Sequence, residues 1–410
     1  MTVPDDDLRR YADVVLRCGV NLEPDQKLLV MGDVGHADLV AALVERAYAM
    51  GAPRVEAAFT DERVLAAQAA GAPTDALAAE APLGYEALFE TVIAERWARV
   101  RTEGDVVEDP FAGVAPGRAN AQSATRLRYV FRTIDAGLNW CLCPCPTEDW
   151  AFRIYGEPDV ARLWRDLRFV LRLDEPDPVA AWEAHRDELA ARAAILDRRG
   201  FTALRFSGGA TELTVPLHAD ARWETAWLST AWGSRFLCNL PSEEVYTAPD
   251  FRGVEGVAAV TKPVTINGVE VEGLMLRFAG GRIVDVEADA NADAARASTG
   301  HDEGAARLGE VALVDGSSRI GVLDLVFHET LLDENAACHI AWGTAIDEAF
   351  PGGAPEDDAR AEERGINRSD VHVDVMIGGP HVRVLGVTAD GDEVPVIDDE
   401  VWRLTDAAGA

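Results

Sequence analysis

Apolar residues in the first part of the chain follow a helix, strand, helix, strand order. From Leu8 to Cys18 they recur at helical spacing, and residues 27–31 form a short apolar run typical of a buried strand. Residues 36–50 again have helical spacing, and residues 54–59 form a second apolar run. A strand, a helix and a strand in this order predict a right-handed parallel unit with the helix on one face.

The rest of the first half is predicted to be mainly helical. Helical patterns follow up to Gly137, and one further strand is expected over residues 139–143. Helices are then expected around Trp150, around Leu163 and over residues 179–199. The last of these is long and rich in alanine, and a glycine follows it, as is common where a helix ends.

Beyond residue 200 the pattern changes to short strands. They are predicted over residues 201–206, 212–217, 257–264, 269–278 and 282–288. The dipeptides Asn267-Gly268 and Gly280-Gly281 lie between three of them and favour tight hairpins, because these residues adopt positive φ at little cost. The sequence thus predicts an α/β N-terminal domain with a parallel sheet over residues 1–195, and an α+β C-terminal domain with antiparallel strands over residues 196–410.

Composition and charge exclude several classes of partner. The chain has 410 residues, 48% of them hydrophobic and 27% charged, as expected for a globular protein. Its 38 basic and 71 acidic residues give a net charge of -33, which repels nucleic acid and anionic lipid. The charge indicates a heavily solvated surface, a salt-adapted host, or attraction of a cationic group such as a peptide amine. Gly32 and Gly35 flank the first strand-to-helix turn without a nucleotide-binding glycine motif.

The sequence also predicts a cytoplasmic protein with reduced cysteines. Its N-terminus is acidic and lacks the basic start and apolar run of a signal peptide, and no apolar stretch is long enough to cross a bilayer. The six cysteines form no small-domain disulfide framework. Cys141, Cys143 and Cys145 occupy alternate positions, unlike the usual two-residue gap between zinc ligands, so we expect buried thiols.

Imidazole and carboxylate groups gather in two downstream segments. The segment from Asp333 to His339 sets acidic residues and a histidine at the start of a predicted helix. Residues 371–376 alternate as a strand does, so His372 and Asp374 share one face. Divalent cations take imidazole and carboxylate together, and this mixture favours zinc, cobalt or manganese. A lone His-x-Asp pair is more often a hydrogen-bonded surface pair, so the metal interpretation depends on the rest of the chain.

Other acidic residues at element ends complete the candidate set. The six potential ligands are one of Glu243 and Glu244 together with Glu310, Glu334, His339, His372 and Asp374. Spacing alone does not separate the two adjacent glutamates. Four carboxylates formally balance two dications, which favours two metals over one. Without metal, these carboxylates would repel and desolvate one another, and some would take up protons.

Several segments resemble the thermophilic metallo-aminopeptidase family that includes aminopeptidases T and S, and the resemblance spans nearly the whole chain. The matching segments are Asn239 to Pro249, Val254 to Gly256, Thr261 to Pro263, Leu308 to Val314, Thr330 to His339 and Asn367 to Gly378. The resemblance implies an N-terminal α/β domain, a C-terminal catalytic metal-binding domain and a homodimer that encloses the sites. The ligands that it implies are Glu244, Glu310, Glu334, His339, His372 and Asp374.

The resemblance implies a metal-dependent aminopeptidase. Such an enzyme would remove N-terminal amino acids from peptides or small aminoacyl substrates with a hydroxide that bridges two divalent ions. Glu243 is the candidate general base; alternatively, it only supports the ligands. The rival interpretations are a non-hydrolytic metalloenzyme, similar to an iron-dependent ring-cleavage dioxygenase, and a catalytically impaired homologue that keeps its metal for stability.

One position departs from the family pattern. The family usually carries a tyrosine seven residues after the histidine of the Asp-Glu-Asn segment, and this chain has Ile346 there. A phenol at that place could stabilise a tetrahedral oxyanion, a contact worth roughly 2.7 to 4 kcal/mol. Either His328, Tyr246 or Arg368 replaces it, or peptidase activity is low. The tryptophans that could line a substrate pocket are expected mostly to pack in the core; they are Trp223, Trp227, Trp232 and Trp342.

Overall fold

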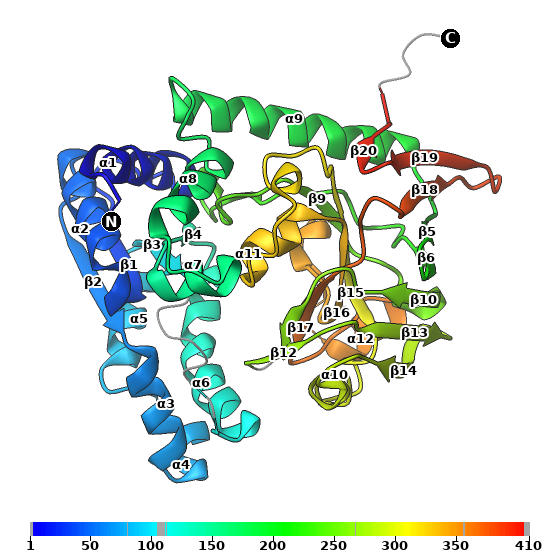
Figure 1. Cartoon of the computed structure of the whole chain (residues 1–410), viewed down its shortest axis with the longest axis horizontal. Coiled ribbons are helices and arrows are strands. Elements are labelled where there is room, and N and C mark those ends of the chain that lie inside the picture. The colour runs from blue at the N-terminus through cyan, green and yellow to red at the C-terminus, as the bar shows by residue number, and fades with distance from the viewer. Residues whose placement is uncertain are drawn as a thin grey trace. The chain divides into compact units, whose positions relative to one another are not determined.

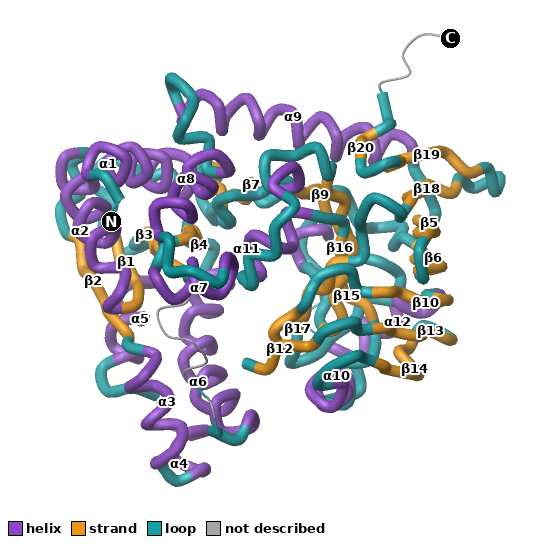
Figure 2. Tube along the Cα trace, viewed as in Figure 1, coloured by secondary structure: helices purple, strands orange, loops and turns teal. Residues whose placement is uncertain are grey.

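The computed structural model describes residues 3–79, 81–104, 111, 113–266, 268–355 and 357–405. The chain forms two compact units. The first comprises residues 1–185 and 226–241, and the second comprises residues 186–225 and 242–410. Figure 2 shows that the first unit is mostly helical and that the second is mostly strand and loop. The domain division near residue 195 remains a prediction from the sequence.

A four-stranded parallel sheet with strand order β2-β1-β3-β4 organises the first unit (Figure 1). The strands are β1 (Leu28–Asp33), β2 (Val55–Thr60), β3 (Ala98–Glu103) and β4 (Trp140–Pro144). The parallel sheet predicted from the apolar pattern is therefore confirmed. The chain runs from β1 outward to β2, then crosses to β3 and on to β4. The carboxyl ends of β1 and β3 thus form the point where the winding of the sheet changes direction.

The sequence analysis was wrong about β3, which it assigned to a helical region. Two arginines interrupt the apolar run of this strand, so its pattern does not resemble a buried strand. The structure accommodates both of them. Arg99 is 1% exposed, and its guanidinium lies 5.7 Å from the centre of the Trp140 ring. Arg101 pairs with Glu103 on the same strand.

Helices and a short hairpin complete the first unit. Several helices begin where a side chain accepts a backbone N–H; Thr147, for example, caps α7 by accepting from the N–H of Trp150. Helix α9 continues into the second unit. The elements are α1 (Asp5–Val14), η1 (Val15–Gly19), η2 (Val34–His36), α2 (Ala37–Ala49), α3 (Glu62–Gly71), α4 (Thr74–Ala79), α5 (Tyr85–Ala94), α6 (Pro116–Asp135), α7 (Glu148–Tyr155), α8 (Val160–Val170), α9 (Pro178–Arg199), β7 (Trp227–Ser229) and β8 (Arg235–Leu237).

The second unit contains two larger antiparallel sheets and a small one. The eight-stranded sheet has the order β14-β13-β10-β6-β5-β18-β19-β20, the four-stranded sheet has the order β17-β16-β15-β9, and β11 pairs with β12. The strands are β5 (Ala203–Gly208), β6 (Thr211–Pro216), β9 (Glu244–Thr247), β10 (Glu255–Ala259), β11 (Val264–Ile266), β12 (Val269–Val271), β13 (Met275–Ala279), β14 (Arg282–Glu287), β15 (Leu308–Val314), β16 (His339–Gly343), β17 (His372–Met376), β18 (Arg383–Val387), β19 (Glu393–Asp398) and β20 (Val401–Trp402).

Short helices connect these strands. They are η3 (Phe251–Gly253), α10 (Ala292–Thr299), η4 (Gly321–Leu323), α11 (Thr330–Asp333), η5 (Glu334–Ala336), η6 (Asp347–Ala349) and α12 (Asp358–Arg364). Among the described residues, no helix combines the length and the apolar character needed to cross a membrane. The α+β character predicted for this part of the chain is confirmed.

Two predicted strands of the second unit are interrupted. Residues 257–264 divide between β10 and β11 at Pro263, which has no N–H to donate to a strand neighbour. Residues 269–278 divide between β12 and β13 at Gly273, whose φ is 62°. The hairpin at Gly280-Gly281 is confirmed, with positive φ at both residues. Asn267, the first residue of the other predicted hairpin, lies outside the described residues.

The apolar core of the second unit includes alternate residues of the four-stranded sheet. Val311 and Leu313 of β15, Ile340 and Trp342 of β16, and Val375 of β17 belong to one buried cluster. Because side chains alternate along a strand, the residues between them face the opposite side of the sheet. Trp223 belongs to the same cluster and Trp227 is also buried, so these tryptophans pack in cores as expected. All six cysteines are free and buried, as predicted.

Candidate metal centre

The four-stranded sheet carries five of the six predicted ligands, and all five lie on the face away from the apolar core. Glu244 begins β9, Glu310 lies in β15, His339 begins β16, and His372 and Asp374 alternate along β17. Register aligns them, since Asp374 pairs with Ala341 of β16, which in turn pairs with Glu310 of β15. One face of the sheet thus brings together side chains from residues as far apart in the sequence as Glu244 and Asp374.

His339 starts a strand, which corrects the helix predicted after Asp333. Two short helical turns, α11 and η5, end at Ala336, and the chain then becomes extended at Ala337. The next strand begins at His339. The sequence indicated a helix because the acidic start of this segment resembles a helix N-terminus. Pairing of β16 with both β15 and β17 outweighs that local preference.

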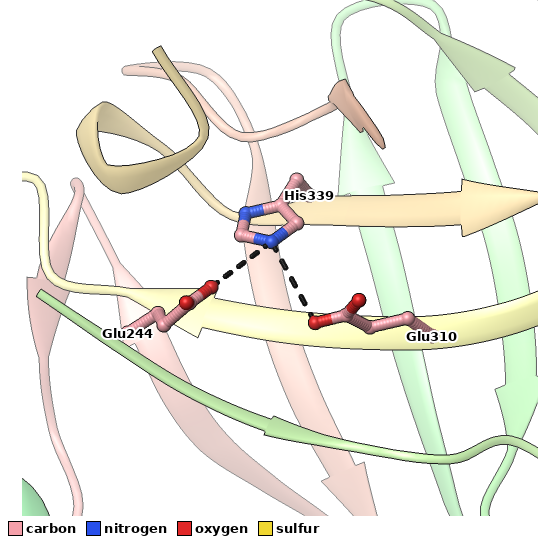
Figure 3. Close-up of side chains that lie close together, drawn as sticks. All are labelled: Glu244, Glu310 and His339. Carbon is pink, nitrogen blue, oxygen red and sulfur yellow. Dashed lines mark ion pairs between the residues drawn. The ribbon is translucent and has the colours of Figure 1, made fainter. Parts of the chain in front are cut away.

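The first cluster consists of Glu244, Glu310 and His339, whose candidate ligand atoms all lie within 4.8 Å of one another. The Nε2 atom of His339 lies 3.1 Å from Oε2 of Glu244 and 3.9 Å from Oε1 of Glu310. Figure 3 shows the imidazole ring directed between the two carboxylates. All three residues are buried.

A second cluster shares Glu310 with the first and adds His372 and Asp374. The Nε2 atom of His372 lies 3.1 Å from Oε2 of Glu310 and 3.5 Å from Oδ1 of Asp374. Glu310 therefore directs one oxygen toward each histidine. The His372 side chain is 28% exposed, whereas that of Glu310 is 5% exposed, so solvent reaches the site beside His372.

Glu334, the sixth predicted ligand, lies outside both clusters but close enough to interact with them electrostatically. It is 9% exposed and belongs to the short turn η5. Burial raises its pKa well above the usual range, and the charges of Asp374, Glu244 and Glu310 raise it further against the opposing effect of His339. The neighbouring Asn335 contacts it, since Nδ2 of Asn335 lies 3.4 Å from Oε1 of Glu334.

The metal-free cluster retains protons that a cation would displace. Burial lowers the pKa of His339, but its hydrogen bond with Glu244 and the nearby carboxylates outweigh burial and raise that pKa to about 10. The pKa of His372 is likewise raised, because Asp374 and Glu310 outweigh burial. Burial and the charge of Asp374 raise the pKa of Glu310. Groups that share protons in this way fit a site made for a cation.

Backbone carbonyls orient both imidazole rings. Nδ1 of His339 lies 3.3 Å from the carbonyl oxygen of Ala337, and Nδ1 of His372 lies 3.0 Å from that of Thr344. A neutral ring with its proton on Nδ1 leaves the Nε2 lone pair directed at the carboxylates. Histidine ligands in metalloproteins are commonly held by such a contact. The donor set therefore fits divalent metal ions.

Sequence reasoning missed Asn335, which connects the two acidic segments. Its Oδ1 accepts from the N–H of Glu243 at 2.7 Å, and its Nδ2 donates to the carbonyl of Leu331 at 2.9 Å. Asn335 is fully buried and Glu243 is 4% exposed. Asn335 lies within the Asp-Glu-Asn segment that drew attention in the sequence. Its partner is 92 residues away, and spacing along the chain gives no sign of that contact.

The three residues considered as replacements for the family tyrosine all have other partners. Nδ1 of His328 lies 2.7 Å from Glu270, and the hydroxyl of Tyr246 donates to the Thr225 carbonyl at 3.4 Å. Arg368 pairs with Asp347 at 2.6 Å. Ile346 itself is partly buried at the start of η6. The two alternatives from the sequence, a replacing donor and low peptidase activity, both stay predictions.

Comparison with known proteins gives matches over nearly the whole chain. A family model described as thermophilic metalloprotease (M29) matches residues 4–402. The chain is 37% identical to aminopeptidase T of Thermus aquaticus, covering 97% of this chain and 99% of that protein. It is 34% identical to aminopeptidase PepS of Streptococcus thermophilus, covering 97% and 98%. The solved structure of wild-type AmpT from Thermus thermophilus superposes with a TM-score of 0.88 at 33% identity, covering 97% of this chain and 99% of that one.

Proposed function

Because this chain belongs to the thermophilic metalloprotease family M29, we propose that it is an aminopeptidase that removes N-terminal amino acids from peptides or small aminoacyl substrates. Family membership makes it a peptide-bond hydrolase, in agreement with the sequence resemblance. The observation that carries the proposal is Glu310, whose two carboxylate oxygens face two different histidines. Such an arrangement supports a pair of divalent ions that share one carboxylate.

We assign the ligands by cluster. One ion would be held by Glu244, Glu310 and His339, and the other by Glu310, His372 and Asp374. Glu334 would complete the set, because it is buried and close enough to both clusters for their charges to add to the effect of burial in raising its pKa. Zinc, cobalt and manganese suit such mixed nitrogen and oxygen donors. Divalent ions held by these residues would supply a hydroxide nucleophile at neutral pH, because metal binding lowers the pKa of a water toward ~7.

The chain's own residues then position the substrate and move protons. The carboxylates around the site favour the free ammonium group of a peptide N-terminus. Glu243 is proposed as the general base, taking a proton from water and delivering it to the leaving amine. Its backbone is held by Asn335, so the carboxylate is presented from a fixed point. The exposed side of His372 is where substrate would enter.

The ring-cleavage alternative is not proposed, because such iron sites use few carboxylates and this donor set holds four. Impaired catalysis depends on Ile346 and is tested separately below. The homodimer and the cytoplasmic location also remain predictions from the sequence.

The test measures metal content together with turnover. Purified chain is dialysed against a chelator, reloaded with zinc, cobalt or manganese, and assayed on leucyl-anilide and on N-acetyl-leucyl-anilide. We expect about two ions per chain, loss of turnover on chelation, recovery on reloading, and no cleavage of the acetylated substrate. Cleavage of the acetylated substrate at an equal rate would contradict the aminopeptidase assignment. One ion per chain at full activity would contradict the two-metal assignment alone.

A further inference from the structure

A cavity lies within the first unit, at the carboxyl ends of the parallel strands. It has a volume of about 330 Å³, within the range of small-molecule sites. The segment after β1 contributes His36 and Asp38, and the segment after β4 contributes Cys145 and Glu148. Open α/β sheets bind ligands outside the carboxyl ends of their strands, where the winding changes direction. In this sheet that place is beside β1 and β3.

His36 lines this cavity, and one of its two ring nitrogens lacks a hydrogen bond. It is 2% exposed, and its Nδ1 lies 2.9 Å from the hydroxyl of Thr102 on β3. Its Nε2 is buried and makes no hydrogen bond of normal length among the described residues, although the Gly104 carbonyl is near enough to raise the pKa of the ring. A buried polar atom without a partner costs free energy comparable to a lost hydrogen bond. A ligand group or a water in the cavity would supply the missing contact.

The charges near the cavity select against anions. Burial lowers the pKa of His36, despite the opposing effects of Asp33, Glu103 and the Gly104 carbonyl, so the ring is neutral at pH 7. Burial also raises the pKa of the Cys145 thiol well above its usual range, which keeps that group uncharged. The charged side chains that line the cavity are the exposed carboxylates of Asp38 and Glu148.

Most of the remaining wall is apolar or aromatic. Leu8 and Tyr11 of α1, Leu39 of α2, and Val160 and Trp164 of α8 line the cavity. The hydroxyl of Tyr11 donates to the Pro144 carbonyl at 2.7 Å, and Nε1 of Trp164 lies 3.0 Å from Asp7. Both aromatic side chains are therefore fixed in place. A rigid apolar wall with carboxylates at its edge suits a molecule with an apolar body and a positive charge.

We propose that this cavity binds a small amphipathic ammonium compound, separately from the metal centre. Its apolar body lies between α1 and α8, its ammonium group faces Asp38 and Glu148, and a hydroxyl or similar polar group pairs with Nε2 of His36. The proposal does not rest on the aminopeptidase assignment, because none of these residues belongs to the candidate metal centre.

Tyramine is the probe, since it carries an aromatic body, an ammonium group and a hydroxyl group. Phenethylamine is the same molecule without the hydroxyl, and 4-hydroxyphenylpropionate replaces the ammonium by a carboxylate. Isothermal titration calorimetry on the full metal-loaded chain and on its Glu310→Gln variant measures all three. In Glu310→Gln, which should lack the metal ions, we expect one saturable tyramine site per chain, weaker binding of phenethylamine, and no binding of the carboxylate.

Variants locate the site. His36→Asn keeps a polar atom facing Thr102 but removes the Nε2 position, so tyramine should bind about three- to tenfold more weakly while phenethylamine changes little. Glu148→Gln should weaken both amines by about two- to fivefold, the size expected for an exposed ion pair. Asp149→Asn is the matched control, because Asp149 is exposed on the same first turn of α7 and does not line the cavity. Val160→Trp should fill the cavity and abolish binding.

The metal centre also attracts amines, so tyramine binding is measured in Glu310→Gln to distinguish binding at this cavity from binding at the metal centre. Tyramine affinity should be unchanged in that variant. The proposal is overturned if tyramine shows no saturable binding, if the carboxylate analogue binds as well as the amine, or if Glu310→Gln abolishes binding. It is also overturned if Glu148→Gln and Val160→Trp leave tyramine affinity unchanged.

Discussion

The backbone N–H of Glu243 donates a 2.7 Å hydrogen bond to Oδ1 of Asn335, so the proposed base and the ligand segment are held by one buried amide. The same side chain donates to the Leu331 carbonyl and contacts the carboxylate of Glu334. Asn335 therefore fixes the positions of two acidic residues at once. Its three contacts make it a residue outside the ligand set whose loss should affect both acidic segments.

Replacing Asn335 by alanine should lower both stability and turnover. The Glu243 N–H and the Leu331 carbonyl would be left without their partner in a buried setting, which costs about 1–3 kcal/mol. Urea denaturation measures that loss, and kinetics on leucyl-anilide should show the activity loss mainly in kcat. Lower stability with unchanged kcat would show that Asn335 supports the fold and not the position of Glu243.

Glu310→Gln should remove both metal ions, whereas His372→Ala should remove one. Only Glu310 belongs to both clusters, and a neutral amide cannot provide the shared negative charge. Elemental analysis measures ions per chain, and circular dichroism checks the fold. Glu287→Gln, at an exposed position on β14, is the control and should keep both ions. Equal metal loss in Glu310→Gln and His372→Ala would argue against a shared carboxylate.

Glu243→Gln separates the two interpretations of Glu243. A general base contributes about 10²- to 10⁴-fold, so kcat should fall by that amount while the metal content stays constant. The amide keeps the shape of the side chain and loses only its ability to take up a proton. If metal content falls along with kcat, Glu243 supports the ligands instead. Metal analysis and steady-state kinetics on one preparation give both numbers.

Metal binding at pH 7 should release protons. The pKa of His339 in the metal-free chain is raised to about 10, and the pKa of His372 is raised as well, because the neighbouring carboxylates outweigh burial and favour the protonated rings. These groups carry protons below their pKa values and must lose them to bind a cation, so apparent affinity should rise with pH. Titration of zinc in buffers of different ionisation enthalpy counts the protons. Identical apparent enthalpies in phosphate and Tris would contradict the expectation.

Ile346→Tyr tests the departure from the family pattern. If no other group stabilises the oxyanion, the new phenol should raise kcat by up to ~10²- to 10³-fold with little change in KM. If another donor already does so, activity should stay flat or fall, because a ring would crowd the partly buried isoleucine site. Ile346→Phe is the control, since it adds the ring without the hydroxyl. A rise in kcat with phenylalanine as well would show that the phenol oxygen is not the cause.

Local patterns in the sequence determined the elements whose side chains follow one simple period. The apolar runs that became β1 and β2, with a helix between them, sufficed for a parallel sheet, and the alternation of residues 371–376 placed His372 and Asp374 on one face. The residue types of the candidate metal centre could also be named from the sequence, because imidazole and carboxylate groups suit a divalent cation, but the choice of Glu244 over Glu243 came from the family resemblance.

Tertiary structure alone decided the remainder. Strand β3 escaped notice because Arg99 is stabilised by the Trp140 ring of a neighbouring strand, a partner that no local pattern reveals. His339 became a strand residue because β15 and β17 pair with its segment on both sides. The two roles of Glu310 depend on register, since strand pairing sets which side chains meet across the sheet. Register is fixed by hydrogen bonds between residues far apart in the chain, and periodicity along a single segment contains no record of them.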